Sequence, residues 1–241
     1  MTTAVINHMQ RLVNEFVELC LLSERMMGRG EFKLSEFKKL DEPFKMIAYV
    51  DEVLKKLGEG SSRATYLLSS GKALKIAIPN NEDKGRAQNQ SELDVYTNPR
   101  TKPVVAKIFD YDPRYNWLIS ELVRPIDADE FKKHFKLSIK TLMDTTLTVY
   151  EAESNADDYL QSKPKIAKLF SMEARSFIDA CVNLIEENEL STGDLEVVNH
   201  WGKTTSGRIV LLDYGLTHDV YSAHYSDENP GSQAITAGGD Q

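Results

Sequence analysis

The stretch from Ser191 to Val220 constrains the chain most, because polar residues stand there beside short apolar runs in a pattern typical of a hairpin. The pattern predicts two short strands, one formed around the two valines before Asn199 and one over Arg208–Leu212. A hairpin of this kind places Asp194, Asn199 and Asp213 near one end of the strands. Two carboxylates and an amide in one place could hold Mg²⁺, since hard cations prefer oxygen ligands.

The spacing of these residues resembles the signatures of the kinase-like phosphotransferase superfamily. Protein kinases carry an H-R-D triplet, an asparagine five residues after its aspartate, and a later D-F-G. Here Thr192-Gly193-Asp194 stands at the first triplet, Asn199 at the matching offset and Asp213-Tyr214-Gly215 at the last. The Gly-Asp-Leu sequence is closer to aminoglycoside phosphotransferases, which also lack the arginine, although Thr192 departs from both patterns. A hairpin with ordinary turn aspartates is the alternative interpretation of this stretch taken alone.

Composition narrows the class of protein. The 241 residues are 41% apolar and 27% charged, which predicts a globular chain that forms one large domain or two small lobes around a cleft. A net charge of −8 argues against nucleic-acid binding through a basic surface. No apolar run is long enough for a membrane span and no signal-peptide pattern is present, so a cytoplasmic protein without membrane contact is expected. Cys20 and Cys181 are predicted to be buried free thiols rather than a disulfide.

Residues 1–50 are predicted to form an N-terminal helical extension. Helical spacing of apolar residues runs from Val5 to Cys20, and a weaker helix is expected over Ser35–Leu40, with Ser35 as its cap. A third helix is expected over Pro43–Leu54, with the proline in its first turn. These helices pack on the domain behind them, or the first one binds a partner protein; the sequence leaves both interpretations open.

Residues 51–124 are predicted to form a nucleotide-binding lobe that begins with a glycine turn. Small residues in such a turn let backbone N–H groups approach phosphate oxygens. Gly58 and Gly60 match the first two glycines of the kinase pattern G-x-G-x-x-G, but Arg63 stands at the third. Ser61, Ser62 and Arg63 could contact phosphate through hydroxyls and a guanidinium. An ordinary hairpin turn is the alternative.

Lys75 lies inside an apolar strand after this turn, where an ammonium needs a partner. Its place resembles the V-A-I-K strand of kinases, which implies contact with the α- and β-phosphates of ATP. Glu92 follows 17 residues later in a predicted helix over Gly85–Tyr96, close to the kinase separation for an ion pair. Glu82 and Asp94 are rival partners, and a snorkelling lysine with a solvated glutamate is the alternative.

Two further strands are expected over Pro103–Tyr111 and Trp117–Val123. In kinases the second of these leads into the hinge between lobes, whose backbone pairs with adenine. By position, the hinge is Glu121 to Val123, and Ile119 or Ser120 lies near the gatekeeper position.

Residues 125–225 are predicted to form a reduced helical lobe, and 226–241 a disordered tail. One or two helices are expected over Asp127–Tyr150, a loop over Glu151–Asp158, a helix over Pro164–Glu187 and order over Leu216–Tyr225. No Ala-Pro-Glu motif follows the D-Y-G triplet, which puts phosphorylation of protein substrates in doubt.

The expected fold is therefore α+β and two-lobed, with a small antiparallel sheet and helix C beside a reduced helical lobe. The resemblance implies an ATP- and Mg²⁺-dependent phosphotransferase that moves the γ-phosphate to an unidentified hydroxyl-bearing acceptor, a protein or a small molecule. Lys75 would orient phosphates, Glu92 would fix Lys75, Asn199 and Asp213 would hold Mg²⁺, and Asp194 would accept the hydroxyl proton.

A catalytically inactive pseudokinase that binds nucleotide or protein is the alternative function. Arg63, Thr192 and the lack of later helices favour it, whereas the retained phosphate- and metal-binding residue types oppose it. Nucleotidyl transfer onto a protein, with ATP bound in reverse, stays open as a third possibility. The Gly-Ser-Ser-Arg loop is similar to that of compact, atypical kinase-like proteins of phages or bacteria.

Overall fold

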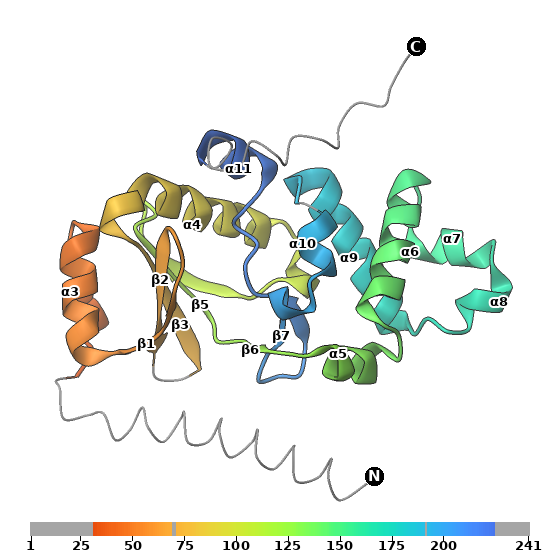
Figure 1. Ribbon diagram of the computed structural model, residues 1–241, viewed down its shortest axis with the longest axis horizontal. Coiled ribbons are helices and arrows are strands. Elements are labelled where there is room, and N and C mark those ends of the chain that lie inside the picture. The colour runs from red at the N-terminus through yellow and green to blue at the C-terminus, as the bar shows by residue number, and fades with distance from the viewer. Residues whose placement is uncertain (1–30, 69–70, 191, 225–241) are drawn as a thin grey trace, which may run out of the picture.

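The computed structural model describes residues 31–68, 71–190 and 192–224, and for Thr192 and Asp194 it describes the backbone alone. The predicted helix from Val5 to Cys20, the glycine breaks at Gly28 and Gly30 and the predicted tail over 226–241 lie outside these residues. The fold is α+β, as predicted: a five-stranded antiparallel sheet and a small three-stranded sheet, combined with helices. The larger sheet with helices α3 (Pro43–Val53) and α4 (Glu82–Thr97) lies at one side, and the helices from α5 (Ala128–Phe135) to α9 (Met172–Asn188) lie at the other (Figure 1).

The five-stranded sheet has the order β1-β2-β3-β5-β4, and each strand is antiparallel to its neighbours. Its strands are β1 (Lys55–Glu59), β2 (Arg63–Leu68), β3 (Lys72–Ala77), β4 (Ile108–Tyr111) and β5 (Trp117–Glu121). The predicted strand over Pro103–Tyr111 is thus wrong in its first half, where a 3₁₀ turn covers Lys102–Val104. Proline has no N–H to donate to a sheet, which suits the turn better.

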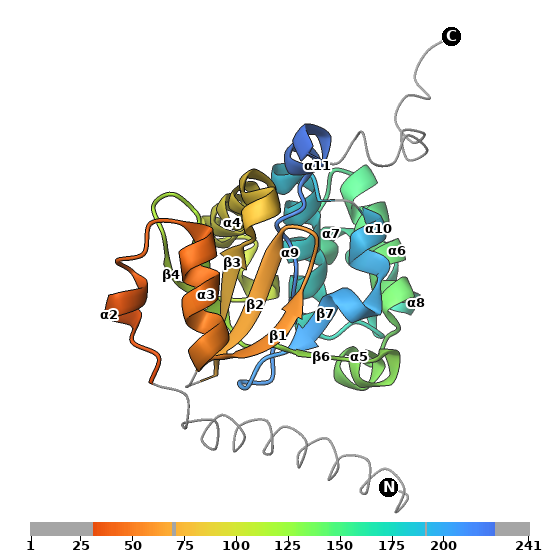
Figure 2. The same cartoon turned by 60° about the vertical axis from the view of Figure 1, so that its left-hand side comes forward.

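Alternation along β2 and β3 gives the sheet two different faces. One face carries apolar residues that pack with helices α2 (Leu34–Phe37) and α3 (Pro43–Val53). This core consists of Phe37, Met46, Val50, Ala64, Tyr66, Leu68, Leu74, Ile76, Trp117 and Ile119. The predicted third helix is confirmed, with proline in its first turn, but Lys33 rather than Ser35 is the N-cap of α2. In Figure 2, α3 lies beside β2 and β3.

The other face of the sheet is covered by α4 (Glu82–Thr97), which confirms the predicted helix around Gly85–Tyr96. Two glycines allow close approach to this helix. A Cβ at Gly85 would lie 2.5 Å from the carbonyl oxygen of Ser62 and 2.7 Å from Cβ of Ala77. A Cβ at Gly215 would lie 2.6 Å from the carbonyl oxygen of Gln88. The helix is therefore held close to the sheet at one end and to the D-Y-G segment farther along.

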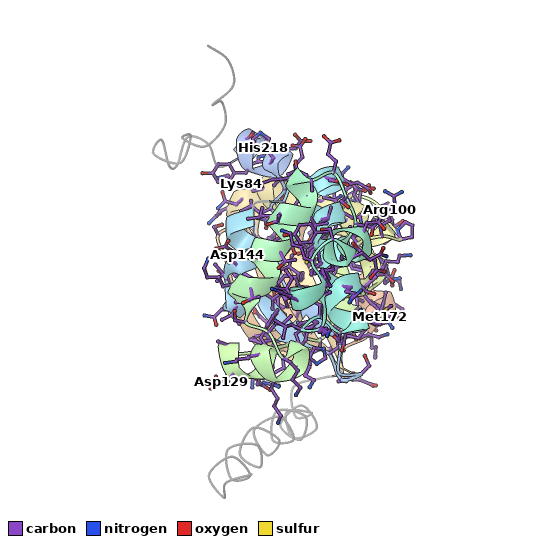
Figure 3. All side chains as sticks on the ribbon, turned by 90° about the vertical axis from the view of Figure 1, so that its right-hand side faces the viewer. Lys84, Arg100, Asp129, Asp144, Met172 and His218 are labelled. Atoms are coloured by element: carbon purple, nitrogen blue, oxygen red, sulfur yellow. The ribbon has the colours of Figure 1, made fainter. Side chains whose placement is uncertain are left out.

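The helical side is built on a separate apolar core. Its helices are α5 (Ala128–Phe135), α6 (Ile139–Glu151), α7 (Ala156–Gln161), α8 (Pro164–Ala167) and α9 (Met172–Asn188). Asp127 caps α5 by accepting a hydrogen bond from the N–H of Glu130. Cys181 on α9 is buried and free, and burial raises the pKa of its thiol. Figure 3 views this side, with the side chains of Arg100, Asp129 and Asp144 at the periphery.

Two predictions for this side are wrong in detail. The predicted continuous helix over Pro164–Glu187 is interrupted between α8 and α9, where the Ser171 side chain accepts from the N–H of Ala174 and starts a new helix. A serine favours a helix start because its hydroxyl satisfies a backbone donor that has no helical partner. The predicted loop over Glu151–Asp158 contains the beginning of α7, which Asn155 caps.

The small sheet has the order β6-β7-β8 and consists of β6 (Arg124–Pro125), β7 (Trp201–Lys203) and β8 (Ile209–Leu211). The predicted hairpin is present, but its first strand begins later than expected. Val197 is 43% exposed, and the helix α10 (Thr192–Glu196) and a 3₁₀ turn over Val198–His200 take the place of a strand. Trp201 is the residue that enters the core, where its ring meets Phe131 and Phe177, so pairing starts there.

The last described helix is α11 (His218–His224), inside the segment predicted to be ordered. It lies over α4 in Figure 1, and Ser91 on α4 donates to Thr217 next to α11 over 3.4 Å. Among the helices of the described residues, none combines the length and the apolar character that crossing a membrane requires.

We predict that Gly85→Ala destabilises the protein by about 1–3 kcal/mol, although alanine favours helices over glycine by about 1 kcal/mol. The added Cβ would collide with backbone at Ser62 and Ala77, and neither can move without distorting the sheet. Urea unfolding followed by circular dichroism measures the change. Gly58→Ala is the matched control, because its Cβ would meet nothing within 4 Å. Greater stability for Gly85→Ala than for wild type would contradict this packing.

Candidate functional site

A cavity of about 580 Å³ is lined by both sheets and the segment that joins them. The lining includes most residues that the sequence predicted for a nucleotide site: Gly58, Gly60, Ser61, Ser62, Arg63, Lys75, Glu121, Val123 and Asp213. Glu92 is not part of the lining and lies behind Lys75, and Asn199 is also not part of it. Residues that lie far apart in the sequence are thus brought together around one hollow.

The predicted ion pair between Lys75 and Glu92 is present. Lys75 Nζ lies 2.7 Å and 2.8 Å from the two carboxylate oxygens of Glu92, and it also donates to the carbonyl oxygen of Leu212 over 3.2 Å. The side chain of Glu92 is 0% exposed. The rival partner Glu82 instead forms an exposed pair with Arg86 on its own helix. A buried carboxylate is tolerable only because cations and hydrogen bonds surround it.

Arg63 completes that environment from the first position of β2. Its Nη1 lies 2.8 Å from Oε1 of Glu92 and 3.3 Å from Oδ1 of Asn89, and its Nη2 lies 2.8 Å from Oδ1 of Asp213. The side chain is buried. The sequence predicted that Arg63 contacts phosphate, but its guanidinium points toward two protein carboxylates in this structure. Phosphate contact by Arg63 therefore stays a prediction that these contacts do not support.

The charges around Asp213 lower the pKa of its carboxyl group. The desolvation of this carboxyl inside the cavity would by itself raise its pKa, but the facing charges of Arg63 and Lys75 outweigh that contribution and hold the pKa below its ordinary value. Burial alone would lower the pKa of Arg63, but the carboxylates of Glu92 and Asp213 raise it above its ordinary value. A lowered carboxyl pKa contributes stability above the ordinary pKa of aspartate, and this contribution is lost as the pH falls through the folded value.

The glycine turn is fastened to α4 rather than projecting freely. The hydroxyl of Ser62 donates to Oε1 of Gln88 over 2.8 Å, and Nδ2 of Asn81 donates to the carbonyl oxygen of Ser61 over 2.7 Å. The N–H of Gly60 donates back across the turn to the carbonyl oxygen of Arg63. The turn therefore presents its backbone to the cavity from a supported position.

The segment predicted as a hinge is also held on both sides. The N–H groups of Glu121 and Leu122 donate to the carbonyl oxygens of Lys107 and Gly71. The carboxylate of Glu121 pairs with Arg208 over 2.8 Å, which fixes this segment to the β7–β8 turn. Among the described residues, the N–H of Val123 has no acceptor, and Val123 lines the cavity. A donor in this place suits a planar heterocycle with a ring-nitrogen acceptor.

The D-Y-G triplet ends the small sheet and points its aspartate at the cavity. The Asp213 side chain is 62% exposed, because much of its surface faces the open hollow. The hydroxyl of the buried Tyr214 donates to the carbonyl oxygen of Ala106 over 2.7 Å, which fixes the segment. The N–H of Leu212 donates to the carbonyl oxygen of His200, so Asn199 and Asp213 are the next residues on the two arms of the hairpin.

These residues fit a divalent cation in part. Oδ1 of Asp213 already accepts from Arg63, which leaves the second oxygen and the amide oxygen of Asn199 as candidate ligands. Asp194 lies in α10, and its side chain is outside the described residues. No group of three or more His, Cys, Asp or Glu side chains within the described ranges could hold a metal ion. Phosphate oxygens would have to complete the coordination.

Several residues of the site were not found from the sequence. On α4, Asn89 accepts a hydrogen bond from Arg63 and Gln88 accepts one from Ser62. Arg208 donates to Glu121 in the segment predicted as a hinge. Asn89 and Gln88 are buried on α4, as Glu92 is. Their position near Glu92 on this helix is the sequence signal that could have identified them. No local pattern distinguishes Arg208, whose partner is 87 residues away.

The chain matches no protein-family model and no curated protein sequence.

We predict that Glu92→Gln destabilises the fold by about 3–5 kcal/mol, because it leaves Lys75 and Arg63 without a shared buried carboxylate. Glu82→Gln, which removes an exposed partner of Arg86 on the same helix, should change stability by at most about 1 kcal/mol. Chemical denaturation at pH 7 compares the two variants. Equal effects would mean that the buried pair contributes no more than a surface pair.

Proposed function

We propose that the protein is an ATP-dependent phosphotransferase with a two-lobed, kinase-like fold. The observation that carries this proposal is the buried Lys75–Glu92 pair, because it presents an ammonium to a cavity that the glycine turn, Val123 and Asp213 also line. A core that needed only stability would have no reason to bury a lysine and a glutamate beside an open hollow.

The arrangement of elements supports the fold assignment. Five antiparallel strands have the order β1-β2-β3-β5-β4, and one long helix follows β3 and covers the cavity face. The chain then passes through Glu121–Val123 to a mostly helical part that ends in the D-Y-G hairpin. On this basis, residues 51–124 form the nucleotide lobe and residues 125–225 form the reduced helical lobe.

Each group has a role that its position suits. The adenine ring would accept from the N–H of Val123, and the backbone of the glycine turn with Lys75 would bind the phosphates. Asp194 would orient the acceptor hydroxyl and take its proton. A magnesium ion bound by Asn199, Asp213 and the phosphates would neutralise charge on the transferring group. Catalysis of this kind consists mostly of positioning and electrostatic stabilisation.

A catalytically inactive, nucleotide-binding pseudokinase is the second candidate. The ion pair between Arg63 and Asp213 favours it, because the guanidinium takes one of the two oxygens that a metal would use. Both candidates use the same cavity, so nucleotide binding supports either one and only phosphoryl transfer separates them.

Isothermal titration calorimetry with ATP and Mg²⁺ tests the shared nucleotide site. We expect a dissociation constant between about 1 μM and 1 mM, the range of ordinary substrates. Lys75→Ala should weaken binding at least about tenfold, because it removes a cation that faces the phosphates. Lys72→Ala is the matched control: Lys72 lies on the same strand but stacks on Phe109, outside the cavity. Equal losses in the two variants would contradict the site.

Phosphoryl transfer is tested with γ-labelled ATP and a panel of hydroxyl-bearing small molecules and proteins. Asp194→Asn should reduce transfer at least about a hundredfold while ATP affinity stays within about threefold, because the carboxylate acts on the acceptor. Binding of ATP without transfer to water or to any acceptor in the panel would favour the pseudokinase. Absence of ATP binding to a folded protein would reject both candidates.

A further inference from the structure

We propose that Arg63 is a fixed internal cation. Its guanidinium supplies, at Asp213, the positive charge that a divalent metal ion would otherwise supply. The nucleotide-free site would then bind divalent cations weakly, and removal of the guanidinium would create a metal site there. The proposal deepens the proposed function, because Asp213 is the residue assigned to Mg²⁺, and it rests on that function only for its biological meaning. Its decisive test needs no nucleotide.

The geometry places a full positive charge directly on the candidate metal ligand. Nη2 of Arg63 lies 2.8 Å from Oδ1 of Asp213, and Nη1 lies 2.8 Å from Oε1 of Glu92. A divalent ion on the other oxygen of Asp213 would share one carboxylate with the guanidinium. Two cations on the two oxygens of one carboxylate repel each other, because only the width of that carboxylate separates them.

The balance of charge leads to the same conclusion. Lys75 and Arg63 contribute two positive charges, and Glu92 and Asp213 contribute two negative charges, so this cluster is neutral. With a glycine at position 63, as in the G-x-G-x-x-G pattern, the same cluster would carry one net negative charge. A neutral cluster attracts a divalent cation less than an anionic one, and it repels the phosphates of a ligand less.

Arg63 cannot easily leave this position. It is buried at the start of β2, and Nη1 also donates to Oδ1 of Asn89 over 3.3 Å. If the Arg63 side chain turned outward, Lys75 would be the one cation left beside Glu92 among the described residues. An arginine also stays protonated in proteins, so no change of pH within the stable range removes its charge. The charged guanidinium of Arg63 is therefore a permanent part of the site.

The test is titration of the full-length, nucleotide-free protein with Mn²⁺, a spectroscopic substitute for Mg²⁺, with free Mn²⁺ measured by electron paramagnetic resonance. We expect wild type to show no site tighter than about 1 mM, a weak affinity for a protein carboxylate site. Arg63→Met keeps an apolar stem but removes the charge, and it should bind Mn²⁺ at least about tenfold tighter. Arg63→Lys keeps the charge and should behave as wild type.

A double variant identifies the ligand. Arg63→Met combined with Asp213→Asn should lose the gained affinity, whereas a gain that persists would place the ion elsewhere on this acidic protein and overturn the proposal. Arg63→Gln provides a second neutral variant that can still donate hydrogen bonds to Glu92, in case the methionine variant does not fold. Circular dichroism shows which variants are folded.

Two results would overturn the proposal directly. One is a wild-type protein that binds Mn²⁺ more tightly than about 0.1 mM at Asp213 without nucleotide, a tenfold excess over the expected limit. The other is a folded, charge-neutral variant whose Mn²⁺ affinity equals that of wild type. Failure of ATP to bind would reject the proposed function but would leave the Mn²⁺ result, and hence this inference, standing. The two failures are therefore distinguishable.

Discussion

The carboxylate of Glu92 is the group on which the rest of the site depends. It is fully buried, and three elements must meet around it: α4, which carries it, β3, which supplies Lys75, and β2, which supplies Arg63. A buried charge without partners would destabilise the fold strongly, so any displacement of one element is opposed by the other two. The same contacts aim the ammonium and the guanidinium at the cavity side of the sheet. Stability and site geometry therefore have one common cause.

Close backbone packing makes this meeting possible. Gly85 lets the start of α4 lie against Ala77 and the glycine turn, and Gly215 lets the D-Y-G segment lie against Gln88 and Glu92. Through Arg63, Asp213 is tied to the same cluster, and through Arg208 the end of β5 at Glu121 is tied to the hairpin that carries Asp213. The cavity is bounded by parts of the chain that hold one another, which suits a site organised before its ligand arrives.

The parts of the fold that could be predicted are those with strong local patterns. Helix α3 was predicted with its proline in the first turn, helix α4 was predicted around Gly85–Tyr96, and the strand carrying Lys75 was predicted from a lysine between apolar neighbours. The distance along the chain between Lys75 and Glu92 was informative because two regular elements span it. Local patterns failed where a residue could take more than one structural role. Ser171 starts a new helix inside an apolar run, and Val197 and Val198 leave their expected strand because Trp201 enters the core instead.

The sequence by itself determined which residue types could take part: a lysine inside an apolar strand, a glutamate on a helix, a glycine turn, and an aspartate and an asparagine at a hairpin. Tertiary structure alone decided the direction of Arg63. Its position in the glycine turn suggested phosphate, yet its partners are Glu92, Asn89 and Asp213, which lie 26 to 150 residues away along the chain. A long side chain at a strand end can face solvent, ligand or core, and local propensity does not separate these choices. The buried carboxylate of Glu92 and the nearby carboxylate of Asp213 select the inward direction, and that selection exists only once the sheet, the helix and the hairpin have come together.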